Sequence, residues 1–94
     1  MALVKLFGNL REMAGSRESD IAGETVREVL DALCRDNEAL RAAILDGDGL
    51  QPHVRVMSNG RDVELHRGLD TPIGEHDQLA IFPPIAGGGT TGSI

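Results

Sequence analysis

One short amphipathic helix in the first half of the chain constrains the fold most strongly. Thr25, followed three residues later by Glu28, has the form of a capping box, which marks a helix start. Apolar residues then recur with the helical period, at Val26, Val29, Leu30, Leu33 and Cys34. Because this stripe covers only one side of the helix, we expect the helix to pack that side against a sheet.

Strands are predicted on both sides of this helix. Residues 2–7 alternate as a strand, with Val4 and Leu6 on one face and Leu3, Lys5 and Phe7 on the other. Residues 17–22 predict a weaker, polar strand that pairs with the first strand as a hairpin. The segment between the two strands, residues 9–15, leaves room for a short helical turn.

The second half of the chain predicts a short helix and further strands. Leu40, Ile44 and Leu45 indicate a helix that ends at the polar residues 46–49. Residues 54–58 alternate as a strand before the turn dipeptide Asn59-Gly60, and residues 63–65 are expected to pair back as a short edge. Residues 69–72 are irregular, and residues 79–82 form a last apolar strand. The predicted fold class is α+β, a mixed four- to five-stranded sheet with one main helix packed across it.

Composition narrows the possible partners and compartment. The 94 residues include two Phe, no Trp or Tyr and one Cys, so the chain can build one core of Leu, Val and Ile but no disulfide framework or thiolate zinc site. The formal net charge of −6, with no run of Lys or Arg, argues against nucleic acid or an anionic membrane and favours a basic patch on a protein partner. No apolar run spans a bilayer. We therefore expect a cytoplasmic protein.

The last strand is followed by IFPPIAGGGTTGSI, which is not compatible with a helix or a central strand. Proline lacks the amide donor that both structures need, and glycine loses the most entropy on ordering. The sequence therefore divides into a folded domain, residues 1–84, and a C-terminal tail, residues 85–94. Pro83 and Pro84 restrict the chain where it leaves the sheet, so the tail loses less entropy on entering a partner.

Four parts of the chain together resemble the MoaD/ThiS family of ubiquitin-like sulfur carriers. These are a first strand ending in LFG, a helix starting GETVREVL, the turn NGRDV and the block DQLAIFPPIAGG at residues 77–88. The last block is the most specific of the four, and the likeness to MoaD, the small subunit of molybdopterin synthase, is the strongest. The resemblance implies a β-grasp fold.

The resemblance also implies a function, which is that of a protein cosubstrate and not of an enzyme. The carboxyl group of Gly88 would be adenylated by a MoeB/ThiF-like enzyme that uses ATP, and then converted by a sulfur donor to a thiocarboxylate. The acceptor would be the large subunit of molybdopterin synthase or another sulfur-transferring synthase. Gly87 and Gly88 suit this role because a chain without side chains can thread a narrow site. No cofactor is expected to bind the carrier itself.

The chain departs from the family pattern after Gly88, because Gly89 and five further residues follow. While they are attached, the terminal carboxylate belongs to Ile94, which is β-branched and poorly suited to a channel shaped for glycine. Some relatives carry such extensions, and a JAMM-type zinc protease removes them. We therefore expect residues 89–94 to be trimmed before activation by a cut between Gly88 and Gly89, within the glycine run Gly87, Gly88 and Gly89 of the tail.

The partner surface is expected beside the root of this tail, at Phe7, Phe82, Pro83, Pro84 and Ile85. Phe7 and Phe82 reach the same sheet face if the first and last strands are parallel neighbours. The pair is then either a docking patch or a second minor core.

Other motifs are better explained structurally. Cys34 lies on the apolar stripe, as a small buried hydrophobe does. His53, His66 and His76 lack a metal-ligand spacing, and the Asp46/Asp48 segment lacks the later ligands of a calcium loop, so no metal site is predicted. Gly87, Gly89 and Gly92 match a dinucleotide motif, but no helix follows them. The alternative to a sulfur carrier is a ubiquitin-like protein modifier or a non-catalytic interaction module.

Overall fold

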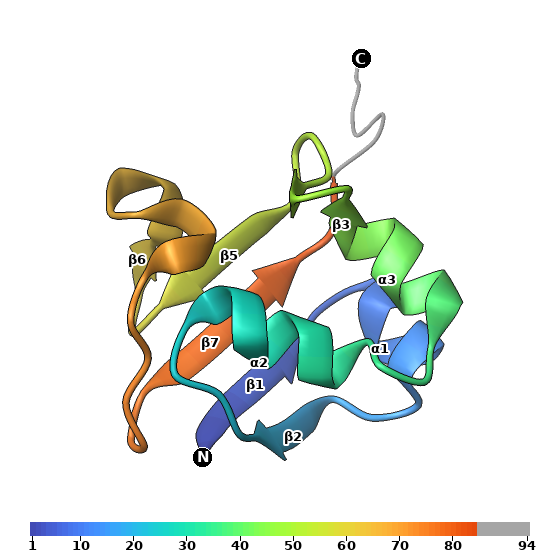
Figure 1. Ribbon diagram of the computed structural model, residues 1–94. Coiled ribbons are helices and arrows are strands. Elements are labelled where there is room, and N and C mark those ends of the chain that lie inside the picture. Colours follow the sequence, from blue (N-terminus) through green and yellow to red (C-terminus); the bar gives the residue numbers. More distant parts are fainter. Residues whose placement is uncertain (85–94) are drawn as a thin grey trace.

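Five strands form one mixed sheet, and helices cover one of its faces (Figure 1). The computed structural model describes residues 1–84. The elements are β1 (Ala2–Leu6), α1 (Asn9–Ala14), β2 (Glu18–Ile21), α2 (Val26–Leu33), α3 (Glu38–Ile44), β3 (Leu45–Asp46), β4 (Gly49–Leu50), β5 (Arg55–Ser58), β6 (Arg61–Asp62), the 3₁₀ turns η1 (Val63–Leu65) and η2 (Gly68–Asp70), and β7 (Gln78–Phe82). This arrangement confirms the predicted α+β class.

The first and last strands lie side by side within the sheet, whose order is β2-β1-β7-β5-β6. They are parallel, and Val4 lies opposite Leu79. β2 is antiparallel to β1, as the predicted hairpin requires, and β5 is antiparallel to β7. Because β1 and β7 are parallel, their carboxyl ends meet at the same end of the sheet (Figure 1).

The helix α2 begins as its sequence predicts. The Thr25 hydroxyl accepts a hydrogen bond from the Glu28 amide at 3.2 Å. The Glu28 carboxylate reaches back to the amide of Glu24, one residue before the cap, at 3.0 Å. Both bonds satisfy amides that no helical carbonyl can reach, and they fix where the helix starts.

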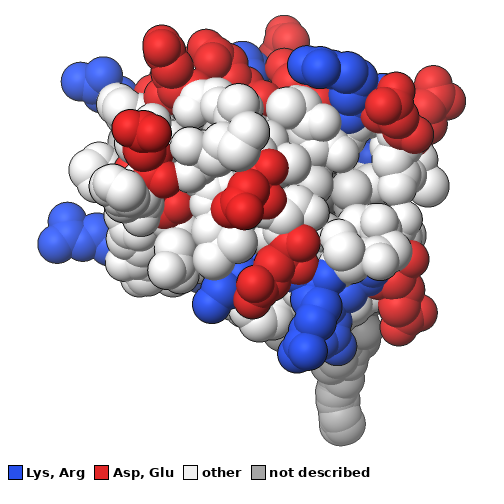
Figure 2. All heavy atoms as spheres, turned by 90° about the horizontal axis from the view of Figure 1, so that it is seen from below, with Lys and Arg blue, Asp and Glu red and all other residues white. Residues whose placement is uncertain are grey.

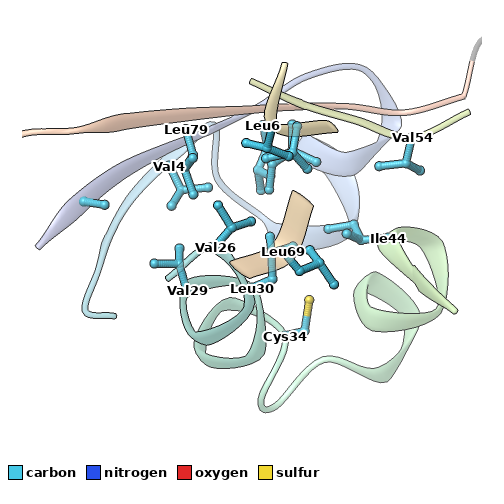
Figure 3. Close-up of a cluster of buried hydrophobic side chains, with 14 of the residues drawn as sticks. Val4, Leu6, Val26, Val29, Leu30, Cys34, Ile44, Val54, Leu69 and Leu79 are labelled. Atoms are coloured by element: carbon cyan, nitrogen blue, oxygen red, sulfur yellow. The ribbon is translucent and has the colours of Figure 1, made fainter. Parts of the chain in front are cut away.

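The core fills the space between the sheet and the helices (Figure 3). From α2, Val26, Val29 and Leu30 are fully buried, while Leu33 at the end of the stripe is partly buried. The strands contribute alternate residues, Val4 and Leu6 from β1, Val56 from β5, and Leu79 and Ile81 from β7. α3 adds Leu40 and Ile44. Burying one such side chain stabilises the fold by about 1.5–3 kcal/mol.

Two local predictions are wrong. Residues 63–65 form the 3₁₀ turn η1 instead of an edge strand, because the hairpin partner of β5 starts directly after the turn, at Arg61. Leu45, expected in the second helix, instead starts β3, because it pairs with Leu50 in the tight β3–β4 hairpin that follows α3. The turn at Asn59 and Gly60 is as predicted, since both residues have positive φ, 51° and 85°, as a type I′ turn requires.

Candidate functional site

Two aromatic rings meet on the sheet face opposite the helices. Phe7 follows β1 and Phe82 ends β7, and their rings are stacked with centroids 4.5 Å apart and planes 9° apart. The Phe7 amide donates to the Ile81 carbonyl at 3.2 Å, which extends the β1–β7 pairing to this point. Phe7 is 37% exposed and Phe82 is 36% exposed. The pair is therefore a partly exposed patch on the surface, not a second core.

Directly beside this stack, Gly8 faces the ring of Pro83 with no room for a side chain between them. Gly8 has φ 59° and ψ −141°, close to a region that only glycine occupies. A Cβ atom on Gly8 would lie 2.8 Å from Cγ of Pro83, nearer than real Cβ contacts allow. Position 8 therefore requires glycine for two reasons, the backbone conformation and the close approach to Pro83. This approach sets the position of Pro83, the first residue after β7.

A shallow hollow of about 480 Å³ lies on the β5 side of the stack, lined by His53, Arg55, Met57, Phe82 and Pro83. A smaller one, about 190 Å³, lies on the β2 side, lined by Lys5, Leu6, Phe7, Arg11, Arg17 and Glu18. The stack thus forms a ridge between two depressions. We call these residues, the exposed Phe7 and Phe82 and the half-buried Pro83, the aromatic ridge.

The structure brings together most of the predicted partner-binding residues. Phe7, Phe82 and Pro83 form the aromatic ridge, and Pro84, the next residue, is exposed. Ile85, Gly87, Gly88 and Gly89 lie outside the described residues. Gly8 was missed by sequence reasoning, although its place directly after the strand, in the LFG motif, was a usable signal. The two hollows depend on side chains from four separate segments, residues 5–11, 17–18, 53–57 and 82–83, and no sequence pattern indicated that these would meet.

Of the four residues considered for nucleophilic or metal chemistry, His53 lines the hollow on the β5 side, and Cys34, His66 and His76 line neither hollow. Cys34 is buried under α2, and this burial raises the pKa of its thiol, as expected for an inert residue. His53, His66 and His76 are all exposed, and among residues 1–84 no group of His, Cys, Asp and Glu is arranged to hold a metal. None of the helices formed by these residues has the length and hydrophobicity to cross a bilayer.

At the opposite end of the sheet, Asp77 ties the start of β7 to the β5–β6 turn. Its carboxylate accepts hydrogen bonds from the Gly74 amide at 2.7 Å and from the Asn59 side chain at 2.8 Å. Asn59 in turn accepts from the Gln78 amide at 2.9 Å. The bond from Gly74, and then that from Asn59, lower the pKa of the Asp77 carboxyl. This cluster holds the strand ends in register and is distant in the sheet from the aromatic ridge.

A mixed sheet with parallel first and last strands and a helix across one face defines a ubiquitin-like β-grasp protein. Comparison with protein families agrees, because the ThiS family model matches residues 4–88. The chain belongs to the ThiS family.

Three relatives illustrate the range of this similarity. The chain is 43% identical over 88 residues to small archaeal modifier protein 1 of Haloferax volcanii, covering 89% of this chain and 97% of that protein. It is 33% identical over 75 residues to an Archaeoglobus fulgidus protein provisionally named a sulfur carrier, covering 79% and 85%. The crystal structure of the Amycolatopsis orientalis BexX/CysO complex contains a chain with TM-score 0.84 and 26% identity, covering 93% and 99%. The family is thus one of small ubiquitin-like carriers and modifiers, not of enzymes.

Proposed function

We propose that this protein is a sulfur carrier in which Gly88, exposed by removal of residues 89–94, is the residue that carries the sulfur. The observation that supports this most is where the family match ends. It runs through residues 4–88 and stops at the second glycine of PPIAGG, so the six residues that follow are additional to the family pattern. The proposal divides the chain into a β-grasp domain, residues 1–84, and a tail, residues 85–94.

The chemistry needs a carboxylate that reaches into another protein. A carboxylate oxygen of Gly88 attacks the α-phosphorus of ATP in the partner's site, releasing pyrophosphate and forming an acyl-adenylate. A donor carrying sulfur at the sulfide level then displaces AMP and leaves a thiocarboxylate. Gly87 and Gly88 add no side chain that could obstruct this path. ATP is bound by the partner, and the carrier itself needs no cofactor.

The aromatic ridge supports this proposal from the folded side of the molecule. It lies at the carboxyl end of β7, where the chain passes from Phe82 to Pro83. A partner that takes up the residues after Pro84 comes close to this ridge. Partly exposed Phe side chains offer such a partner apolar area at a small cost in conformational entropy.

The proposed partners follow from the steps of the cycle. They are a JAMM-type protease for trimming, a MoeB/ThiF-like adenylating enzyme, a sulfur donor and an acceptor enzyme. The acceptor is the large subunit of a molybdopterin synthase or a synthase that makes cysteine, homocysteine or another sulfur-containing metabolite. Because the cycle consumes ATP, we place it in the cytoplasm. Neither nucleic acid nor a membrane takes part.

A second function is favoured by a specific observation, the 43% identity to a protein named a modifier. In that function the activated Gly88 forms an isopeptide bond with a lysine of another protein. Both functions share the adenylation step and differ in the nucleophile that displaces AMP. The two functions therefore differ in the product that accumulates.

The experiment compares chains with different ends, incubated with the adenylating enzyme of the same organism, ATP and a sulfide donor. The forms are the full-length chain and chains ending at Gly87, Gly88 and Gly89. We expect only the chain ending at Gly88 to gain the mass difference of sulfur for oxygen in intact-mass spectra. The chain ending at Gly87 keeps the same domain and controls for tail length.

Two outcomes would contradict the proposal. If the full-length chain is converted as readily as the form ending at Gly88, residues 89–94 do not mask the terminus. If the form ending at Gly88 gives adducts on lysines of other proteins and no thiocarboxylate when sulfide is present, the modifier function replaces the carrier function.

A further inference from the structure

Basic side chains border the aromatic ridge on both sides. On the β2 side they are Lys5, Arg11 and Arg17, and on the β5 side Arg55, with His53 beside it. Four of the nine Lys and Arg residues of the chain therefore line two small hollows next to one pair of rings. Figure 2, which views the molecule from below, shows Lys and Arg side chains interspersed with Asp and Glu over that face.

Few acidic groups offset this charge locally. Glu18, which lies opposite Lys5 in the β1–β2 pairing, is the one acid lining either hollow in the described part of the chain. Arg55 is paired with Asp62 at 3.3 Å. Within residues 1–84, neither Lys5, Arg11 nor Arg17 forms an ion pair. Since the whole chain has a net charge of −6, the ridge is a basic area on an acidic protein.

We infer that the partner docking on this ridge presents an apolar socket bordered by carboxylates. This inference rests on the proposed function, because it concerns the partner that receives the tail. It differs from the expectation drawn from net charge alone, which was a basic patch on the partner. The aromatic ridge fills the socket, and Lys5, Arg11, Arg17 and Arg55 meet the carboxylates around it.

This distribution of charge also fixes the direction of approach. An acidic rim on the partner is attracted to the ridge and repelled by the rest of the molecule, where the acidic residues predominate. Charges at the edge of an interface mainly steer encounter and exclude wrong orientations, while the buried centre supplies most of the affinity. The encounter is therefore biased toward the orientation in which residues 85–88 can enter the partner.

Arg17 is the best residue for testing this. Its side chain is exposed, and its structural contribution is the backbone carbonyl, which accepts from the Leu6 amide at 2.8 Å and is kept in any side-chain variant. Arg35 is a matched control, since it is also an exposed arginine but lies beyond the end of α2 and lines neither hollow.

The experiment measures the dissociation constant between the chain ending at Gly88 and the MoeB/ThiF-like enzyme of the same organism, by titration calorimetry without ATP. At about 50 mM salt we expect Arg17→Glu to weaken binding roughly tenfold and Arg35→Glu to change it less than about twofold. Binding of the unaltered chain should weaken with added salt, and that of Arg17→Glu should weaken less steeply. Circular dichroism and thermal unfolding verify that both variants are folded.

The inference is overturned if the two variants bind equally well, if Arg17→Glu binds more tightly, or if the unaltered chain does not bind the enzyme. These results are distinct from failure of the proposed function. If the unaltered chain binds with the expected dependence on charge but is never adenylated once ATP is added, the docking surface stands and the carrier chemistry is wrong.

Discussion

Gly8 and Pro83 are packed so closely that no side chain fits between them. Gly8 is the second residue after β1 and Pro83 the first after β7, and a Cβ atom on Gly8 would lie only 2.8 Å from the proline ring. A glycine far from the C-terminal tail in sequence therefore determines where the tail begins. Within residues 1–84, this close approach fixes the folded domain to the last residues before the proposed tail.

Replacing Gly8 by Ala should destabilise the fold by about 2–4 kcal/mol, because backbone strain and the collision with Pro83 add together. Gly15→Ala is the control, since Gly15 also has a positive φ, 77°, but has open space around it. It should cost about 1–2 kcal/mol, the strain of a left-handed residue alone. Urea unfolding measures both. If Pro83→Ala recovers none of the stability lost in Gly8→Ala, the ring contact does not cause the loss.

Replacing Phe7 by Asp should impair activation without unfolding the domain. Phe7 is partly exposed, so the change removes the stacking on Phe82 and places a negative charge on the aromatic ridge. We expect the KM of the adenylating enzyme for the chain ending at Gly88 to rise at least about tenfold, as for the loss of a central interface residue. Leu65→Asp, at a site 85% exposed on η1, is the control. Equal KM values for the two folded variants would show that the ridge is not the interface.

Replacing Leu30 by Ala should cost about 2–5 kcal/mol of unfolding free energy, because a fully buried side chain on α2 is replaced by a cavity. The same change at Leu65, which is exposed, should cost less than about 0.5 kcal/mol. Denaturant titration of the two variants measures this difference. Similar losses in both would contradict the packing of α2 on the sheet.

Asp77 should make the stability depend on pH in the acid range. Hydrogen bonds from Gly74 and Asn59 lower its pKa in the folded state, so its contribution is complete above the unfolded pKa of about 4 and is lost as pH falls through the folded pKa. Urea unfolding between about pH 7 and pH 3 should therefore show a smaller loss of stability for Asp77→Asn than for the unaltered chain. Asp36→Asn, in an exposed turn, is the control. An unchanged pH profile in Asp77→Asn would refute this role.

Local sequence signals predicted those parts of the fold that depend on near neighbours. The capping residues Thr25 and Glu28 and the apolar stripe after them determine α2 without help from distant contacts. Asn59 and Gly60 likewise specify their own turn, because both accept positive φ. The alternation in β1 separated its two faces, and the face of Val4 and Leu6 is the buried one.

The parts that were missed depend on contacts between distant segments. Residues 63–65 have a strand-like composition. They do not pair with β5, because β7 occupies one edge of β5 and Arg61 and Asp62 occupy the other. The contact of Gly8 with Pro83 requires the parallel pairing of β1 and β7, which no local pattern encodes. The basic border of the ridge could not be predicted either, because Arg17 and Arg55 are far apart in sequence and the net charge of the chain is negative.

The placement of β7 beside β1 has a consequence for biosynthesis. β7 is the last of these strands to be made, yet without it β1 and β5 are not connected and the sheet is in two parts. A nascent chain that has not reached Phe82 cannot complete the core, so folding has to wait for this long-range pairing. A chain whose synthesis stops early therefore stays unfolded and open to proteolysis. Such incomplete chains, which lack the tail, therefore do not compete with complete chains for partners that recognise the folded surface.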